Sequence, residues 1–272
     1  AQVFCGEGAL VLIWDGTYIY IQKSDSDHKL QRETFSLQKG RNLLKFMTIC
    51  CSNGYVVDMI GPFPGDVNYN DAKITEEIID KETEIMDLMN SNNTCCILDR
   101  GFRDAQSPLE AKGINVQMPA FKPKGVNQLS PIDANRSRLV TKLRFVVETV
   151  HGRFKTIWPF FKNTISNTLI PVIGPSLRIA IATLNAFRSH PVVFRPEVEE
   201  EAREMLMKSE QETNPLADRI LTNSSLSFRN KQNWEPMDSF GGAEEFPTLE
   251  IEDIRQITYG PYQLRKAQHY TA

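Results

Sequence analysis

Three acidic residues stand where a rigid backbone would hold a carboxylate. Asp15 lies in an apolar stretch typical of a strand, Asp99 follows a second such stretch, and Glu148 lies on an amphipathic helix. Three carboxylates that meet at one point cannot all stay ionised without a cation. Their oxygens suit Mg²⁺ or Mn²⁺, and two ions about 3.5 to 4 Å apart can promote phosphodiester cleavage. Taken singly, however, an Asp before Gly is usually a turn residue and a helical Glu is usually solvated.

The surrounding pattern predicts the elements that would position these acids. We expect strands at residues 9–21, 45–51, 55–60, 94–98 and 115–118, and helices at 70–90, 105–112, 135–154 and 175–187. Ser52-Asn53-Gly54 predicts a tight hairpin. In an RNase H-like sheet the first strand lies beside the later parallel strand, and a following helix can present a third carboxylate. We therefore predict an α/β, RNase H-like mixed sheet flanked by helices.

Several motifs in a fixed order carry a family resemblance. They are DGTYIYIQKS, FSLQKGRNLLKFMTI, GPFPGDVNYNDA, LDRGFRD, MPAF, NRSRLVTKLRFVVETVHGRFK and LNAF, spread over residues 13–187. Together they resemble the Harbinger/ISL2EU-like, IS5-related DDE transposases. The resemblance implies two-metal-ion cleavage and strand transfer on DNA, with Asp15, Asp99 and Glu148 as the catalytic, metal-binding triad. It also implies transposon ends and target DNA as partners, a nuclear location, and a homo-oligomer or an accessory DNA-binding module.

The charge distribution favours a polyanion near the same residues. The net charge is −3, yet residues 100–162 carry 12 Lys and Arg against 4 Asp and Glu. The candidates for nucleic-acid binding are Arg100, Arg103, Arg144, His151, Arg153 and Lys155. Arg144, Glu148, His151 and Lys155 follow helical spacing, so one face would present the acid among cations, with Gly152 leaving open space beside it.

Ordinary structural roles compete with this interpretation. Arg144 could simply pair with Glu148 along the helix, and Asp71 could be a helix N-cap. His151 could be structural, since a lone helical histidine often is. The basic residues at 39, 41 and 45 fit a solvated strand edge.

Composition bounds the remaining properties. We place a boundary near residue 190, with the catalytic domain at 1–190 and an acidic, partly disordered extension at 191–272, because the second part has 15 acidic and 9 basic residues. Five cysteines without CxxC spacing predict neither disulfides nor structural zinc. The apolar run at residues 9–14 is too short for a membrane span, and we predict no membrane association and no secretion. The chain opens on Ala1, which suggests an excerpt.

Two other functions are weighed against endonuclease activity. Asp15-Gly16-Thr17 resembles the end of the motif of haloacid-dehalogenase-type phosphatases, but Ile13 stands where the nucleophilic aspartate would be needed. The stronger alternative is a domesticated, transposase-derived protein that binds DNA or a partner and no longer cuts. An intact set of three acids favours the enzyme.

Overall fold

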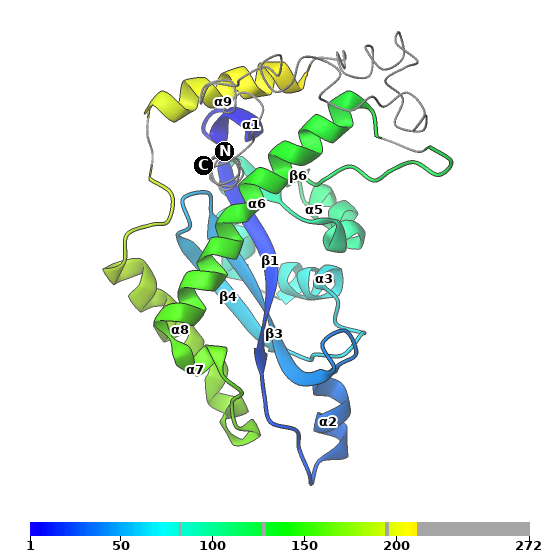
Figure 1. The fold of residues 1–272 in the computed structure, drawn as a ribbon, viewed down its shortest axis with the longest axis vertical. Helices are drawn as coiled ribbons and strands as arrows, with labels where there is room; N and C mark the ends of the chain where they lie inside the picture. Colours follow the sequence, from blue (N-terminus) through cyan, green and yellow to red (C-terminus); the bar gives the residue numbers. More distant parts are fainter. Residues whose placement is uncertain (82, 127–128, 194–195, 211–272) are drawn as a thin grey trace, which may run out of the picture. The chain divides into compact units, whose positions relative to one another are not determined.

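A computed structural model describes residues 1–272 apart from 82, 127–128, 194–195 and 211–272 (Figure 1). Its strands are β1 (Leu10–Tyr20), β2 (Phe35–Ser36), β3 (Arg41–Cys51), β4 (Val56–Phe63), β5 (Thr94–Ile97) and β6 (Asn115–Gln117). They form one mixed sheet in the order β2-β3-β1-β5-β6, with β4 also paired to β3. The predicted α/β class with a mixed sheet is confirmed.

The first strand lies in the middle of this sheet. β1 pairs with β3 in the antiparallel direction from Leu12↔Cys51 to Tyr20↔Leu43. On its other edge it pairs with β5 in the parallel direction, but only from Leu10↔Thr94 to Ile13↔Ile97. The predicted parallel neighbour of the first strand is therefore present, and so is the predicted β3–β4 hairpin.

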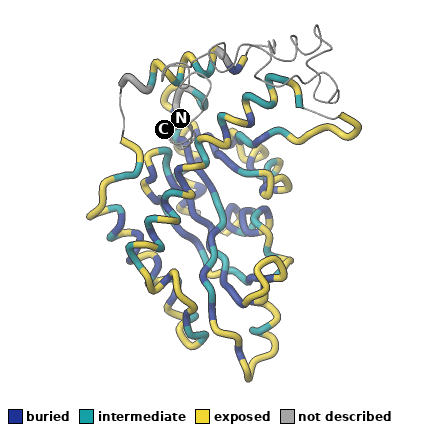
Figure 2. Tube along the Cα trace, viewed as in Figure 1, coloured by how far each residue is buried: buried dark blue, intermediate teal, exposed yellow. Residues whose placement is uncertain are grey.

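Helices cover both faces of the sheet. The helical segments beyond α1 (Gln2–Cys5) and α2 (His28–Thr34) are α3 (Asp71–Lys81), α4 (Thr83–Asn90), η1 (Arg100–Ala105), α5 (Gln106–Ala111), α6 (Pro131–Ile157), α7 (Pro159–Lys162), η2 (Asn167–Leu169), α8 (Ile170–Phe187) and α9 (Pro196–Ser209). One buried cluster joins the sheet to α6, α7 and α8, and a second joins it to α3, α4, η1 and α5. The buried residues are concentrated in the sheet and on those sides of the helices that point toward the sheet (Figure 2).

The helices differ from the sequence prediction mainly at their ends. The helix predicted at 70–90 is described as two helices, α3 and α4, on either side of residue 82. The long helix α6 begins at Pro131 with Ser130 as its N-cap, because the Ser130 side chain accepts a hydrogen bond from the Asp133 amide. It crosses one face of the sheet, with α7 and α8 following (Figure 1).

The helix α8 also has the length and apolar composition of a membrane span, and it is the one such helix within the described residues. Its inward side chains are Ile173, Leu177, Ala180, Ile181 and Leu184, and they belong to the core cluster shared with the sheet. The apolar residues on that face of α8 are therefore explained by packing against the sheet.

The residues beyond 190 contain one further described helix. The helix α9 contacts α1 and α6, and the compact unit that includes the sheet runs from Ala1 to Glu210. The predicted boundary near 190 thus precedes an element of this unit. The rest of the predicted acidic extension, residues 211–272, lies outside the described residues.

Candidate functional site

Strand register brings Asp15 and Asp99 to the same place. The last parallel pair of β1 and β5 is Ile13↔Ile97, and each aspartate stands two residues beyond its member of that pair. Residues two apart on neighbouring strands lie on the same face. Asp99 is also fixed by a turn, since its Oδ1 accepts a hydrogen bond from the Gly101 amide at 2.6 Å. The two predicted acids therefore lie side by side where the pairing of β1 and β5 ends.

The cation between these carboxylates is Arg144 of α6. Its Nη2 atom lies 3.2 Å from Oδ1 of Asp15 and 3.2 Å from Oδ2 of Asp99. The Arg144 side chain is 14% exposed, and its Nε atom is buried without a hydrogen-bond partner among the described residues. The alternative of a simple helical pair with Glu148 is therefore wrong, because Arg144 is bound to the strand acids instead.

Burial and the Arg144 cation shift the pKa of Asp15 in opposite directions. Burial raises the pKa of Asp15 to about 6, while Arg144 opposes the rise and the negative charges of Asp99 and Asp71 add to it. A carboxyl group with such a pKa changes charge easily when a cation approaches. The Arg144 guanidinium therefore offsets only part of the effect of burial on Asp15.

His151, also on α6, lies next to Asp15 and contacts its β3 neighbour. Its Nε2 lies 2.8 Å from the buried hydroxyl of Thr48, which pairs with Asp15 across β1 and β3. Its Nδ1 lies 3.8 Å from Oδ2 of Asp15. Burial, together with the charge of Lys155, lowers the pKa of His151 to about 4, so the ring is neutral at neutral pH. The neutral ring therefore adds no positive charge beside Asp15, and its hydrogen bond is to Thr48.

Asp71 belongs to this site, which the sequence analysis did not predict. The cap of α3 is Asn70, whose side-chain oxygen accepts from the Lys73 amide, so the N-cap role suggested for Asp71 is wrong. The Asp71 carboxylate instead packs over two glycines. An added Cβ would lie 2.6 Å from Asp71 Oδ1 at Gly16 and 3.4 Å from its Oδ2 at Gly101.

The electrostatics of Asp71 agree with this placement. Burial raises the pKa of Asp71, and the neighbouring charge of Asp99 raises it further. The sequence signal was the Asn-Asp pair at the start of a helix, where only one side chain can serve as the cap. The other side chain is then free for the site.

Glu148 does not join the strand acids in this structure. Its side chain is exposed, and none of the hydrogen bonds or ion pairs among the described residues involves it. Across the described part of the chain, no three His, Cys, Asp or Glu side chains are placed together to hold a metal ion. The assignment of Glu148 as the third ligand stays a prediction.

The predicted DNA-binding residues lie in three different settings. Lys155 donates from Nζ to the Tyr18 carbonyl at 3.0 Å and lies over the Tyr18 ring. Arg153 donates to the Ser189 carbonyl at 2.8 Å, which fixes the chain after α8. Arg100 and Arg103 are exposed on η1, close in sequence to Asp99, and Arg103 lies over the Phe121 ring.

The carboxylate oxygens of these residues are of the type that binds divalent cations. Asp15 and Asp99 converge on one positive charge at equal distances, and Asp71 lies against Gly16 and Gly101, which are close to them in sequence. Carboxylate oxygens are the ligands that Mg²⁺ and Mn²⁺ prefer. In this structure the two carboxylates bind the Arg144 guanidinium instead.

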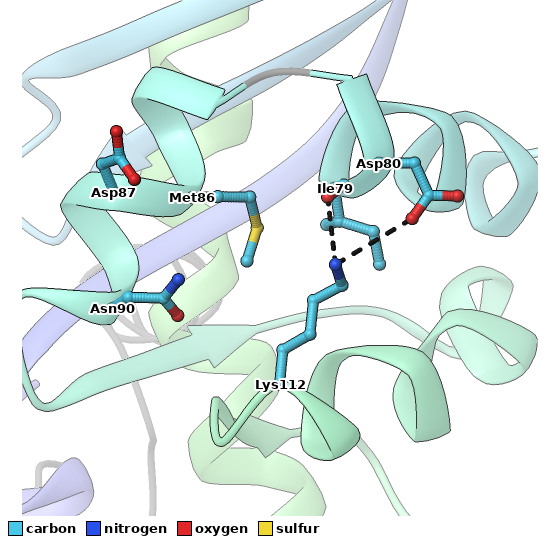
Figure 3. A pocket seen from close by; sticks show the side chains of 6 residues that line it. All are labelled: Ile79, Asp80, Met86, Asp87, Asn90 and Lys112. Carbon is cyan, nitrogen blue, oxygen red and sulfur yellow. Dashed lines mark hydrogen bonds and ion pairs between the residues drawn. The ribbon is translucent and has the colours of Figure 1, made fainter.

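A separate pocket lies between α3, α4 and the end of α5 (Figure 3). It is lined by Ile79, Asp80, Met86, Asp87, Asn90 and Lys112. The Lys112 ammonium lies 3.3 Å from the Ile79 carbonyl and 3.9 Å from the Asp80 carboxylate. None of the predicted site residues lines this pocket, and its polar groups serve to join two helices.

Comparison with known proteins gives a family match over the region that contains these acidic residues. A family model described as DDE superfamily endonuclease matches residues 14–185, which is more than half of the chain and includes Asp15, Asp71, Asp99 and Glu148. No curated protein and no solved structure matches.

Proposed function

Because the chain belongs to the DDE superfamily endonucleases, we propose that it is the catalytic domain of a DNA transposase of the Harbinger-like group. We infer an RNase H-like core, two divalent ions as cofactors, and cleavage and strand transfer on DNA as the reaction. The partners are transposon ends and target DNA, reached in the nucleus as a homo-oligomer or through an accessory module. Each of these finer assignments goes beyond family membership.

One observation carries this proposal. Two aspartates at matching positions of neighbouring parallel strands converge within 3.2 Å of a single buried cation, inside the region that matches the family. An enzyme that works on a phosphodiester through hard cations needs carboxylates that a rigid sheet holds together. The β1–β5 register provides that rigidity.

The residues around the acids have definable tasks. Asp15 and Asp99 would hold Mg²⁺ or Mn²⁺, with Glu148 completing the second site from α6. When bound, the ions would activate a water or 3′-hydroxyl and stabilise the leaving oxygen. His151 hydrogen-bonds to Thr48, the β3 partner of Asp15, and Arg144 would bind the scissile phosphate once a metal ion neutralises the carboxylates. Arg100, Arg103, Arg153 and Lys155 would contact DNA phosphates.

The test is metal-dependent cleavage of a labelled DNA duplex by the full chain. Mn²⁺ should produce cleavage by the wild type, whereas Asp15→Ala and Glu148→Gln should show none above background. Glu148→Gln keeps the side-chain shape and removes its charge, and Glu84→Gln, which removes a negative charge from an exposed residue of α4, serves as a matched charge control. A wild type that is folded and binds DNA but never cuts would favour the domesticated binding protein over the endonuclease.

A further inference from the structure

The strand that carries Asp15 has an open edge next to the acids. β5 pairs with β1 only as far as Ile13, and the next neighbour on that side is Ile165, which exchanges backbone hydrogen bonds with Tyr20 and Gln22. Between Ile13 and Tyr20 no strand covers that edge within the described residues. At about 3.3 Å per residue, the stretch from Asp15 to Tyr20 extends roughly 17 Å away from the acids.

Two tyrosines in this stretch of β1 are in contact with three cations. Tyr18 and Tyr20 contact each other at 5.2 Å between ring centroids. Lys39 lies 5.2 Å and Lys155 4.7 Å from the centre of the Tyr18 ring, and Arg41 lies 4.1 Å from the centre of the Tyr20 ring. We name these five residues the tyrosine track.

The cations of the tyrosine track are not neutralised by acids. None of the salt bridges in the described part of the chain includes Lys39, Arg41 or Lys155. Lys39 and Arg41 are exposed, and Arg41 is held by a hydrogen bond to Thr164 Oγ1 at 2.9 Å. A solvated strand edge, as the sequence suggested, would not require cations fixed over aromatic rings.

The chemistry of the track selects its partner. Aromatic rings that alternate with unpaired cations bind single-stranded nucleic acid, since bases stack on the rings and phosphates contact the cations. An added peptide strand is disfavoured, because the Tyr18 carbonyl already accepts a hydrogen bond from Lys155. A duplex is disfavoured as well, because its base faces are hidden in the stack.

We propose that the tyrosine track binds one unpaired DNA strand, with bases stacked on Tyr18 and Tyr20 and phosphates on Lys39, Arg41 and Lys155. The placement of this strand beside a cleavage position rests on the proposed endonuclease function. The capture of the strand does not, because it depends on the rings and the cations alone.

Fluorescence anisotropy with the full chain in EDTA tests this proposal without cleavage. The probes are a short labelled oligothymidylate and a duplex of the same length. Tyr20→Ala should weaken oligothymidylate binding roughly tenfold and leave duplex binding unchanged, while Tyr20→Phe keeps the ring and the affinity. Arg41→Gln should lower the salt dependence of binding by about one phosphate contact.

The matched control is Tyr55→Ala, which removes an exposed tyrosine that contacts His190 at the start of the β4 hairpin. Circular dichroism would verify that each variant is folded. Equal binding by Tyr20→Ala and Tyr55→Ala would overturn the track, as would a wild type that binds no oligothymidylate. Equal losses on both probes would overturn its assignment to a single strand.

A parallel cleavage assay separates this proposal from the endonuclease function. A wild type that binds through Tyr20 but never cuts with Mn²⁺ would leave the track standing and remove the endonuclease. A wild type that cuts, with a Tyr20→Ala variant that binds the oligothymidylate normally, would do the reverse.

Discussion

The strand side and the helix side of the site differ in how completely they are assembled. On the strand side, Asp15 and Asp99 share a buried arginine and Asp71 packs beside them. On the helix side, Glu148 is exposed, and its side chain takes no part in the hydrogen bonds or ion pairs of the described residues. The difference teaches that backbone pairing fixes the first group, whereas the second depends on a single side chain at the rim of a helix face.

Substitutions of the acidic residues should have the largest effects on the cleavage rate. In Mn²⁺-dependent cleavage, Asp99→Asn should lower the rate by several hundredfold or more, because ligand loss removes several kcal/mol of transition-state stabilisation. Asp71→Asn should cost about 10- to 100-fold, as expected for a group that supports the ligands. The control Asn70→Ala removes the neighbouring cap and should affect stability only.

The alternative result of that experiment would change the assignment. If Asp71→Asn lost as much activity as Asp99→Asn while Glu148→Gln cut normally, Asp71 and not Glu148 would be the third acid. The strand side would then contain the complete ligand set.

The sequence could predict the strand side because short apolar runs and their parallel pairing are local patterns with a fixed geometry. Thr94 to Leu98 could only be a buried strand, and the residue after it had to lie at the strand end. The helix side is harder. At 100° per residue, Arg144, Glu148 and His151 all lie on the same face of the helix. The sequence alone therefore does not show which of them points toward the sheet.

Two other features depended on contacts that a single sequence does not encode. The choice of Asn70 over Asp71 as the cap was open, because both are good N-cap residues. The tyrosine track required knowing that β5 ends at Ile97 and leaves the edge of β1 uncovered. Neither the type nor the spacing of these residues reveals that a neighbouring strand is short.

The pH dependence of stability should expose two groups with opposing effects, Asp15 on β1 and His151 on α6. The pKa of Asp15 is raised from 3.8 to about 6, so its contribution to the free energy of unfolding falls by about 3 kcal/mol as pH rises through that window. The pKa of His151 is lowered from 6.5 to about 4, so its contribution rises by about 3 kcal/mol over nearly the same window. In the wild type the two slopes should largely cancel.

Single substitutions should separate these slopes. Urea denaturation at several pH values between 4 and 6.5 should show stability rising with pH in Asp15→Asn, where His151 acts alone. It should show stability falling with pH in His151→Gln, where Asp15 acts alone. Identical pH profiles for both variants and the wild type would mean that neither group is buried in the charge state described.

The Arg144 bridge should matter more than an exposed pair of the same length. Arg144→Gln leaves two carboxylates without their cation and should cost about 2 kcal/mol at neutral pH, since the group is mostly buried. Arg178 and Asp58 are also 3.2 Å apart, but the Arg178 side chain is 59% exposed, so Arg178→Gln should cost less than about 1 kcal/mol. Both are measured by urea denaturation.

Metal addition sharpens this prediction. In Arg144→Gln the carboxylates have no competing guanidinium, so millimolar Mn²⁺ should raise its Tm more than that of the wild type. An equal Tm shift in both proteins would show that a bound ion does not use the position that Arg144 takes. Equal losses of stability for the two arginine variants would show that the strand side is as solvated as the surface.

The last contrast lies between two glycines, Gly16 on the strand side of the site and Gly152 on the helix side. At Gly16 a methyl group would lie 2.6 Å from Asp71 Oδ1, so Gly16→Ala must displace that carboxylate and should lower cleavage toward the level of Asp71→Asn. At Gly152 no atom lies within 4 Å of an added methyl group, and Gly152→Ala should stabilise α6 by about 0.5 to 1 kcal/mol. Thermal denaturation and cleavage of both variants test this contrast. If Gly152→Ala were stable but failed to cut, the open surface beside Glu148 would be where the phosphate docks, and the helix side would be as specific as the strand side.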